Sequence, residues 1–523
     1  MKWLNHYYNQ LLELNFKTWV VSILVIWLPI SNLAVQYVVN VLKGTTLVAN
    51  IKDILIIGLI INLGLDIFLV IKNYLIAGKG SILPRLKSLI LPCLPLILVL
   101  FLNILALGSS FIFNRVSLKT FLIGYYFELF WLDLLAIWLT WSNLKSFLPK
   151  SQPALIPNFD WSVIIRSISI GFLLVSLVSL FSIGFGQAET LKNFGYGQAS
   201  TGGLVSSNNP CHNVDYGIAT CRLMGSFGHP LHFVGYLLLV LAIFINQAII
   251  TRGWYSRLFY LALVSCNLFF IYFSHTRFAI FGLVLTLTWL IFGLIGGYLN
   301  REYLFFGKVI KLLTSKVALI FVLSIILLTT LFVVNIDINT QFPSLASNLP
   351  TSLTKPSSSA WHIRQTQSNL QVIQDSPNKL FIGFGVGMAG STARPKYQDI
   401  ENNPIYQKIL LQGRFYPDMI QEFIMIPDNW FIQTTLNGGL IYTLVYLLLL
   451  LYPLRYVFNL FKESCWDTRS ITFGFLVCGL LAILVGSLIQ QLFESQVTTF
   501  FFIVISVIVS RPQKPSPSVK LIS

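Results

Sequence analysis

Residues 428–442 read Asp-Asn-Trp-Phe-Ile-Gln-Thr-Thr-Leu-Asn-Gly-Gly-Leu-Ile-Tyr, an apolar segment that opens on two polar residues. A long polar stretch, 336–427, precedes it, whereas most of the remaining chain is apolar. Such a stretch is long and polar enough to form a pocket outside a membrane. We therefore expect any chemistry on a water-soluble group to involve this stretch and the segment that follows it.

The composition is that of a membrane protein. Of 523 residues, 55% are hydrophobic and only 10% are charged, whereas soluble domains carry about 25% charged residues. The mean hydropathy is +0.75. A membrane span needs roughly 20 mostly apolar residues. Twelve such runs are present, at 18–42, 53–71, 88–108, 118–140, 162–186, 229–250, 258–274, 277–297, 317–335, 429–451, 471–490 and 496–510.

The sequence therefore predicts an all-α polytopic membrane protein with about 12 transmembrane helices and a large, partly helical external loop between spans 9 and 10. Six segments follow from the runs: spans 1–5 in residues 1–186, an external loop at 187–228, spans 6–9 in 229–335, the large external loop at 336–427, spans 10–12 in 428–510, and a cytoplasmic tail at 511–523.

Basic residues set the predicted orientation. Lys and Arg gather in the segments that are cytoplasmic if the N-terminus is inside, which is the pattern of the positive-inside rule. We therefore expect a multi-pass protein of the plasma membrane (the cell inner membrane) with both termini in the cytoplasm. The net charge of +16 then anchors inner segments to anionic membrane lipids, and we expect no nucleic acid partner.

Two cysteines share the predicted external loop 187–228, namely Cys211 and Cys221. An oxidising exterior favours a disulfide between them. The alternative is a zinc site, but His212 is the one further ligand beside them in the sequence. We expect the disulfide and no metal.

Two acidic residues, Glu128 and Asp133, lie inside the predicted span 118–140. A carboxylate is expensive to bury without a partner, and an ionisable residue inside a membrane span is by default a functional hypothesis. Two interpretations stay open. The two acids are either a hydrogen-bonded structural pair or part of a path for protons or substrate.

Three arginines lie on predicted outer segments. Arg222 opens the sequence Arg-Leu-Met-Gly-Ser-Phe-Gly-His-Pro at 222–230, just before a span. Arg277 ends the short connection Ser-His-Thr-Arg. Arg364 lies in 361–375, which predicts a helix ended by a proline. One face of this helix, polar except for its first residue, recurs at intervals of three and four: Trp361, Arg364, Ser368, Gln371 and Asp375.

The order of these features resembles that of the O-antigen ligase and polymerase superfamily of membrane glycosyltransferases. The resemblance covers roughly 222–442: the Arg222 segment, the serine and arginine of 274–277, the helix at 361–375, the glycine-punctuated 381–388 and Asp428. This chain departs from the pattern in two places. Two residues separate the serine from the arginine in 274–277, and ligases carry histidine where Asp428 stands.

The resemblance implies transfer of a glycan from an undecaprenyl-pyrophosphate carrier to an acceptor glycan or lipid, by a polymerase or a ligase of cell-surface polysaccharide biosynthesis. A leaving pyrophosphate needs fixed cations, and an acceptor hydroxyl needs a base. The expected substrate-binding residues are Arg222, Arg277, Arg364 and Asn429, and the expected catalytic residues are Asp428 and His362. We expect no cofactor, and a polysaccharide-assembly complex as a further partner.

Two other functions are weighed against this one. The first is a membrane transporter, either a flippase for lipid-linked oligosaccharide or a carrier of a small anion such as bicarbonate; a carrier should show repeats and broken helices at matching positions, and no repeat is evident. The second is a scaffold. Asp428 also has a structural alternative, because an aspartate after Pro427 has the position of a helix N-cap.

Overall fold

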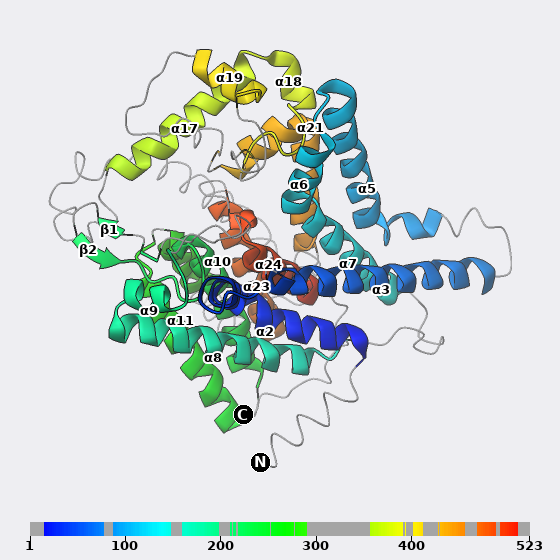
Figure 1. Ribbon diagram of the computed structural model, residues 1–523. Helices are drawn as coiled ribbons and strands as arrows, with labels where there is room; N and C mark the ends of the chain where they lie inside the picture. Colours follow the sequence, from blue (N-terminus) through cyan, green and yellow to red (C-terminus); the bar gives the residue numbers. More distant parts are fainter. Residues whose placement is uncertain are drawn as a thin grey trace, which may run out of the picture.

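The computed structural model describes residues 15–45, 47–77, 87–147, 159–197, 210–211, 213–215, 218–251, 253–276, 278–289, 356–390, 393, 401–411, 427, 429–455, 468–487 and 492–510. These residues are predominantly helical, with one short β-hairpin (Figure 1).

The first half of the chain forms α2 (Phe16–Gln36), the π-helix η1 (Tyr37–Val41), α3 (Leu47–Ala77), α5 (Leu94–Leu107), the π-helix η2 (Gly108–Phe113), α6 (Leu118–Glu128), α7 (Phe130–Phe147), α8 (Trp161–Phe185), α9 (Gln187–Asn193) and the strands β1 (Asn213–Asp215) and β2 (Ile218–Cys221). The second half forms α10 (Pro230–Ile250), α11 (Trp254–Phe273), α17 (Pro356–Gln374), α18 (Pro377–Ile382), α19 (Pro404–Leu411), α21 (Trp430–Leu451), α23 (Thr468–Gly486), the 3-10 helix η3 (Leu492–Glu494) and α24 (Gln496–Val509).

Seven of the described helical segments are long and apolar enough to cross a membrane, or eight if the bent pair α6 and α7 counts as one span. Three shorter apolar helices lie at 278–289, 474–486 and 496–509, each within a run in which the sequence predicts a span. The predicted run 317–335 lies outside the described residues.

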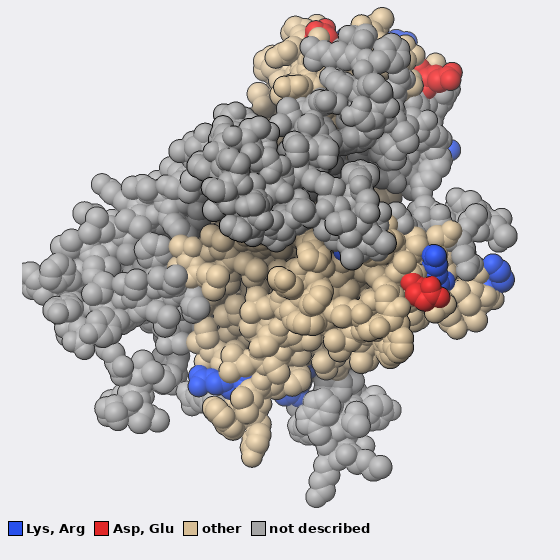
Figure 2. All heavy atoms as spheres, turned by 90° about the vertical axis from the view of Figure 1, so that its left-hand side faces the viewer, with Lys and Arg blue, Asp and Glu red and all other residues tan. Residues whose placement is uncertain are grey.

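Apolar side chains cover the outside of these helices, as expected of surfaces in contact with lipid. Along α3, Ile54 is 69% exposed and Phe68 is 62% exposed, and soluble monomers rarely expose many such side chains side by side. Figure 2 shows a broad area of described surface that is almost without Lys, Arg, Asp or Glu, while charged side chains lie mainly near its margins. The described part of the chain is therefore built as a membrane protein.

The bundle contains a buried ion pair between Lys17 and Asp66. Lys17, in the first turn of α2, donates to the Asp66 carboxylate of α3, and both are largely buried. The indole N–H of Trp141 in α7 donates to the same carboxylate at 3.1 Å. These contacts join three helices and satisfy the buried charges, as a low-dielectric interior requires.

Helices α17, α18 and α19 and the glycine segment 383–390 form a separate body, which we call the lobe. In Figure 1 the three helices lie together at the top of the view, near the ends of α5 and α21. The lobe has its own apolar core, in which Val372, Phe384 and Ile405 pack with Ile432 and Leu436 of α21. The first half of α21 therefore belongs to the membrane bundle and to the lobe at once.

The lobe is hydrogen-bonded to α21 at a kink. Gly439 has a φ of 87° and interrupts the helix, which frees carbonyl groups that an unbroken helix would use internally. The N–H of Phe384 donates to Leu436 O at 2.6 Å, and the N–H of Gly385 donates to Asn437 O at 2.8 Å. The break in the helix thus supplies the acceptors that hold the lobe.

The glycines of the segment allow a close approach between backbones. Gly383 and Gly387 have φ angles of 67° and 89°, which side chains rarely adopt. A Cβ at Gly387 would lie 2.5 Å from Thr120 O in α6, and one at Gly383 would lie 2.4 Å from Asn437 O. The glycines therefore let the segment pack directly against the backbones of α6 and α21.

We predict that Gly387→Ala destabilises the protein, because the new Cβ meets a helix carbonyl and takes a strained φ. The expected loss is on the order of 1–3 kcal/mol, measured by thermal unfolding in detergent. Gly64→Ala is the matched control, because a Cβ there meets nothing within 4 Å. Equal losses of stability in the two variants would contradict the close packing of the lobe on α6.

Candidate functional site

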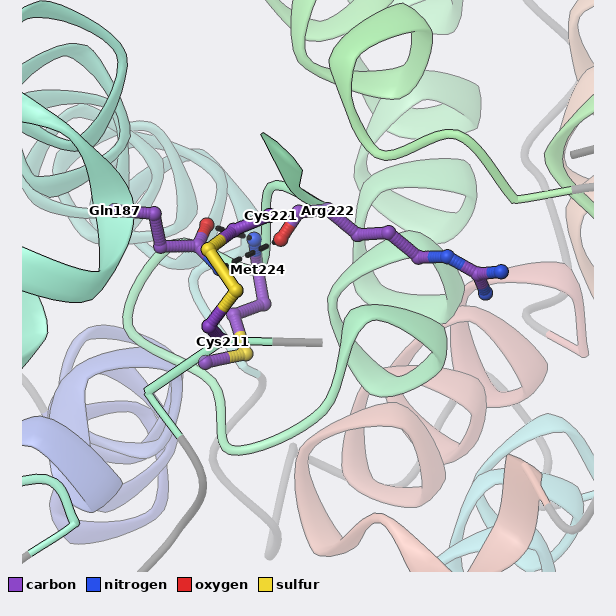
Figure 3. Close-up of a disulfide and its surroundings, with 5 residues drawn as sticks. All are labelled: Gln187, Cys211, Cys221, Arg222 and Met224. Atoms are coloured by element: carbon purple, nitrogen blue, oxygen red, sulfur yellow. Dashed lines mark hydrogen bonds between the residues drawn. A yellow bond between two sulfur atoms is a disulfide. The ribbon is translucent and has the colours of Figure 1, made fainter. Parts of the chain in front are cut away.

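The segment that carries Arg222 is held by a covalent and a hydrogen-bonded clamp (Figure 3). Cys211 and Cys221 form the disulfide that the sequence predicts, with a Cα–Cα distance of 5.1 Å. The buried side chain of Gln187 donates to Arg222 O at 2.6 Å and accepts from the N–H of Met224 at 2.9 Å. One amide group thus binds the backbone on both sides of Leu223.

The turn that follows is anchored to α2. Ser226 is fully buried, and its hydroxyl donates to Pro29 O at 2.6 Å. The Tyr196 hydroxyl donates to Ser226 O at 2.9 Å and accepts from Asn32 at 3.2 Å. Because a buried polar group without a partner is costly, this network fixes where the chain leaves the clamp and enters α10.

The clamped segment is joined to the connection after α11. The N–H of Leu223 donates to Phe273 O at 3.1 Å. Ser274 follows, and its buried hydroxyl donates to Ile271 O at 2.6 Å and lies 3.2 Å from the hydroxyl of Thr276. The structure therefore brings Arg222 beside the turn whose next residue in the sequence is Arg277.

His275 is the middle residue of this turn. Its φ is 48°, in the left-handed region. Its side chain is half-buried, and burial, followed by the charge of Arg222, lowers the pKa of its imidazole below the usual value. The site thus holds a guanidinium and a neutral imidazole within electrostatic reach of each other.

A second cationic feature lies on the lobe. Lys379 of α18 donates to the side chain of Asn114 and lies 5.6 Å from the ring centroid of Phe384. Burial, followed by the charge of Lys408 in α19, lowers the pKa of the Lys379 ammonium. Two like charges are therefore held near each other, in a setting that an anion would stabilise.

A buried carboxylate lies where the lobe meets the bundle. Glu128 ends α6 at the bend before α7, and its side chain accepts from Asn437 and, at 3.2 Å, from Gln433. The Asn437 side chain also accepts from the N–H of Ala389 at 2.8 Å. One amide therefore connects the lobe to the acid. The cavity beside Glu128 holds about 10 Å³, room for one water at most.

The two acids in this region have separate partners. Asp133 accepts from the Asn103 side chain at 2.9 Å and from the Tyr125 hydroxyl, whereas Glu128 is bonded to α21. Each acid is thus hydrogen-bonded, as the structural interpretation expects, although the two acids use different partners. Their contacts favour a structural role, in which each acid joins different helices.

The other predicted site residues are placed only in part. Arg277 and Asp428 lie outside the described residues. His362 and Arg364 lie on α17, although their side chains are not described. Asn429 is described: its side chain accepts from the N–H groups of the two residues after Trp430, at 2.9 and 3.3 Å.

The cap of α21 corrects one sequence interpretation. Asp428 was the expected N-cap on the structural alternative, but Asn429 caps the helix. Both residue types are good caps, and the helix begins one residue later than the proline suggested. The Oδ1 of Asn429 accepts the two capping hydrogen bonds. A role of Asn429 in substrate binding therefore stays a prediction that concerns its Nδ2.

The predicted helix after Trp361 is confirmed and is longer than expected, since α17 begins at Pro356. Its predicted polar face is not presented as a unit. Ser368 is 1% exposed and packs into the protein, whereas Asp375 follows the helix and is exposed. Asn369 is buried as well. The residues of the predicted polar face are therefore divided between the buried and the exposed sides of the helix.

Sequence reasoning missed two residues of this site, Gln187 and His275. Nothing local marks Gln187, because its partners lie 35 and 37 positions away. His275 did carry a signal, because it is one of the two residues between Ser274 and Arg277. No protein-family model matches the chain, and no curated protein matches its sequence.

We predict that Gln187→Leu loosens the Arg222 segment. The change removes both hydrogen bonds and leaves buried backbone groups unsatisfied, which costs about 1–3 kcal/mol. Thermal unfolding and limited proteolysis of residues 187–228 measure the effect. Gln367→Leu, at an exposed position of α17, is the control. Unchanged stability and protease resistance in Gln187→Leu would show that the clamp is not needed.

Proposed function

We propose that the protein is a glycosyltransferase that moves a glycan from an undecaprenyl-pyrophosphate carrier to an acceptor glycan or lipid, as a polymerase or ligase of cell-surface polysaccharide biosynthesis. One observation carries the proposal. The Arg222 segment is hydrogen-bonded to the turn that leads to Arg277, although the two are far apart in the sequence. The Arg222 guanidinium therefore lies on a segment joined to this turn, and a cation there suits an anion such as pyrophosphate.

The way the segment is held also supports an anion site. The disulfide and Gln187 hold the backbone, and the guanidinium of Arg222 extends away from them (Figure 3). Bidentate binding of phosphate oxygens requires a planar guanidinium on a backbone that is held in place. Such preorganised charge stabilises the pyrophosphate as the sugar leaves it.

The proposed topology places this site at the outer face of the plasma membrane. It has twelve spans with both termini in the cytoplasm, and residues 187–228 and 336–427 outside. The apolar helices found in eleven of the twelve predicted runs support the spans, and the distribution of Lys and Arg supports the orientation. The lobe would then stand outside the membrane, beside the head group of a lipid-linked donor.

In this proposal the remaining predicted residues complete the site. Arg277 and Arg364 join Arg222 on the pyrophosphate, and Asn429 contacts the donor. Asp428 and His362 lie near the acceptor hydroxyl and orient it. The guanidiniums supply the positive charge, so the proposed transfer needs no metal.

A membrane carrier is the second candidate, and two interrupted helical segments favour it. The pair α6 and α7 is bent by 47° at a break inside an apolar segment, and α21 is kinked at Gly439. Carriers often bind their substrates where membrane helices are interrupted. The lobe is hydrogen-bonded to the break in α21, and Gln433 of α21 donates to Glu128 at the bend. These contacts favour a structural reason for both breaks.

We predict that purified protein forms a glycosidic bond when given a synthetic polyprenyl-pyrophosphate oligosaccharide and an acceptor, detected by mass spectrometry. Arg222→Ala should lower the rate at least about tenfold, since a buried charge-assisted contact is worth about 1.5–3 kcal/mol. Arg222→Lys should also lose activity, because lysine lacks the planar fork. Lys192→Ala, at an exposed site on α9, is the control.

The outcomes separate the candidates. Transport of the lipid-linked glycan across a vesicle membrane, without bond formation, would move the protein to the carrier class. Full transfer activity in Arg222→Ala would remove Arg222 from the donor site.

A further inference from the structure

The three described residues of the turn after α11, 274–276, differ in burial and in hydrogen bonding. Ser274 and Thr276 are buried, and their hydroxyl groups hold the turn together. His275, between them, stays partly accessible. Among the described residues, no hydrogen bond involves either of its ring nitrogens. The imidazole is therefore presented by the turn and is not used in building it.

The backbone conformation of His275 is also unusual. A φ of 48° is uncommon for a residue with a side chain, and glycine or asparagine would adopt it with less strain. Residues held in sparsely populated backbone conformations gather at functional sites.

The surroundings determine the charge of the imidazole. Among the described residues, Arg222 is the charged group that acts on it, and Tyr272 lies beside it with a centroid distance of 6.1 Å between the rings. Burial and the guanidinium both disfavour a second positive charge, so the pKa of His275 lies below the ordinary 6.5. At neutral pH a ring nitrogen keeps its lone pair.

We propose that His275 is the catalytic base that accepts the proton of the acceptor hydroxyl. This inference rests on the proposed glycosyl transfer. The acceptor oxygen forms a bond with the anomeric carbon of the donor as the bond from that carbon to the phosphate oxygen breaks. The electron pair of the broken bond stays on the pyrophosphate beside Arg222, and the hydroxyl proton moves to the imidazole.

The position of His275 suits both partners of this step. The pyrophosphate is attached directly to the carbon under attack, so a base for the acceptor must lie about one sugar unit from the anion site. His275 lies in the turn to which the Arg222 segment is hydrogen-bonded, through Leu223 N and Phe273 O at 3.1 Å. His229, by contrast, is occupied as the N-cap of α10, where its Nδ1 accepts from Leu231 N at 3.3 Å.

The test compares two histidine-to-asparagine variants that each preserve a backbone role. Asparagine tolerates the left-handed conformation at His275, and it is also a good N-cap at His229. In the transfer assay, His275→Asn should lower the rate about 100-fold or more with an unchanged melting temperature. His229→Asn should keep the rate of the unaltered protein.

The pH profile separates a base from a structural residue. In the unaltered protein the rate should fall as acid protonates His275, below about pH 6.5, and level off above it. His275→Asn should lose this acid limb. A normal rate in His275→Asn, or an acid limb that persists unchanged, overturns the inference while leaving glycosyl transfer intact. Absence of transfer by the unaltered protein overturns the proposed function and this inference with it.

A measurement without turnover keeps the inference falsifiable. Diethyl pyrocarbonate modifies the neutral imidazole, and mass spectrometry can follow His275 as a function of pH. Arg222→Ala should move the midpoint of its modification to higher pH, because a nearby positive charge is lost. Inorganic pyrophosphate should move it in the same direction in the unaltered protein. A midpoint that neither change moves would show that His275 does not face the anion site.

Discussion

Every interruption of a helix inside a membrane must find new partners for its backbone, because hydrocarbon supplies none. The structure meets this constraint by docking the lobe where the bundle is interrupted. The kink at Gly439 frees carbonyls that accept from Phe384 and Gly385. The π-helix η2 contributes the Ser110 hydroxyl, which accepts from Val386 N at 2.9 Å. Asn437 and Glu128 complete the junction. The groups that the helix breaks leave without helical partners are therefore the groups that bind the lobe.

The Arg222 site follows a different principle, in which the backbone is fixed so that side chains can act. The segment is held by a disulfide, by the side chain of Gln187 and by a backbone hydrogen bond from Leu223 to Phe273. Each of these contacts uses main-chain groups or cysteine sulfur. The Arg222 guanidinium and the His275 imidazole, which lie within electrostatic reach of each other, are not among these contacts. A site arranged in this way suits an anionic donor.

Local sequence patterns predicted the features that depend on local physics. Runs of apolar residues located the helices, the pair of cysteines in one predicted external loop located the disulfide between Cys211 and Cys221, and periodicity located α17. Features that depend on long-range contact were not predictable. The partners of Glu128 are 305 and 309 positions away, and no spacing rule connects them. Nor did the sequence distinguish Asn429 from Asp428 as a cap, since both are favourable and adjacent.

The central claim is that Arg222 helps to bind a lipid pyrophosphate, and direct binding tests it without requiring turnover. Equilibrium binding of a fluorescent polyprenyl pyrophosphate to detergent-solubilised protein should be competed by inorganic pyrophosphate. Arg222→Ala should weaken the binding at least about tenfold, in line with the loss of a charge-assisted contact. Equal affinity in the unaltered protein and in folded Arg222→Ala would contradict the account.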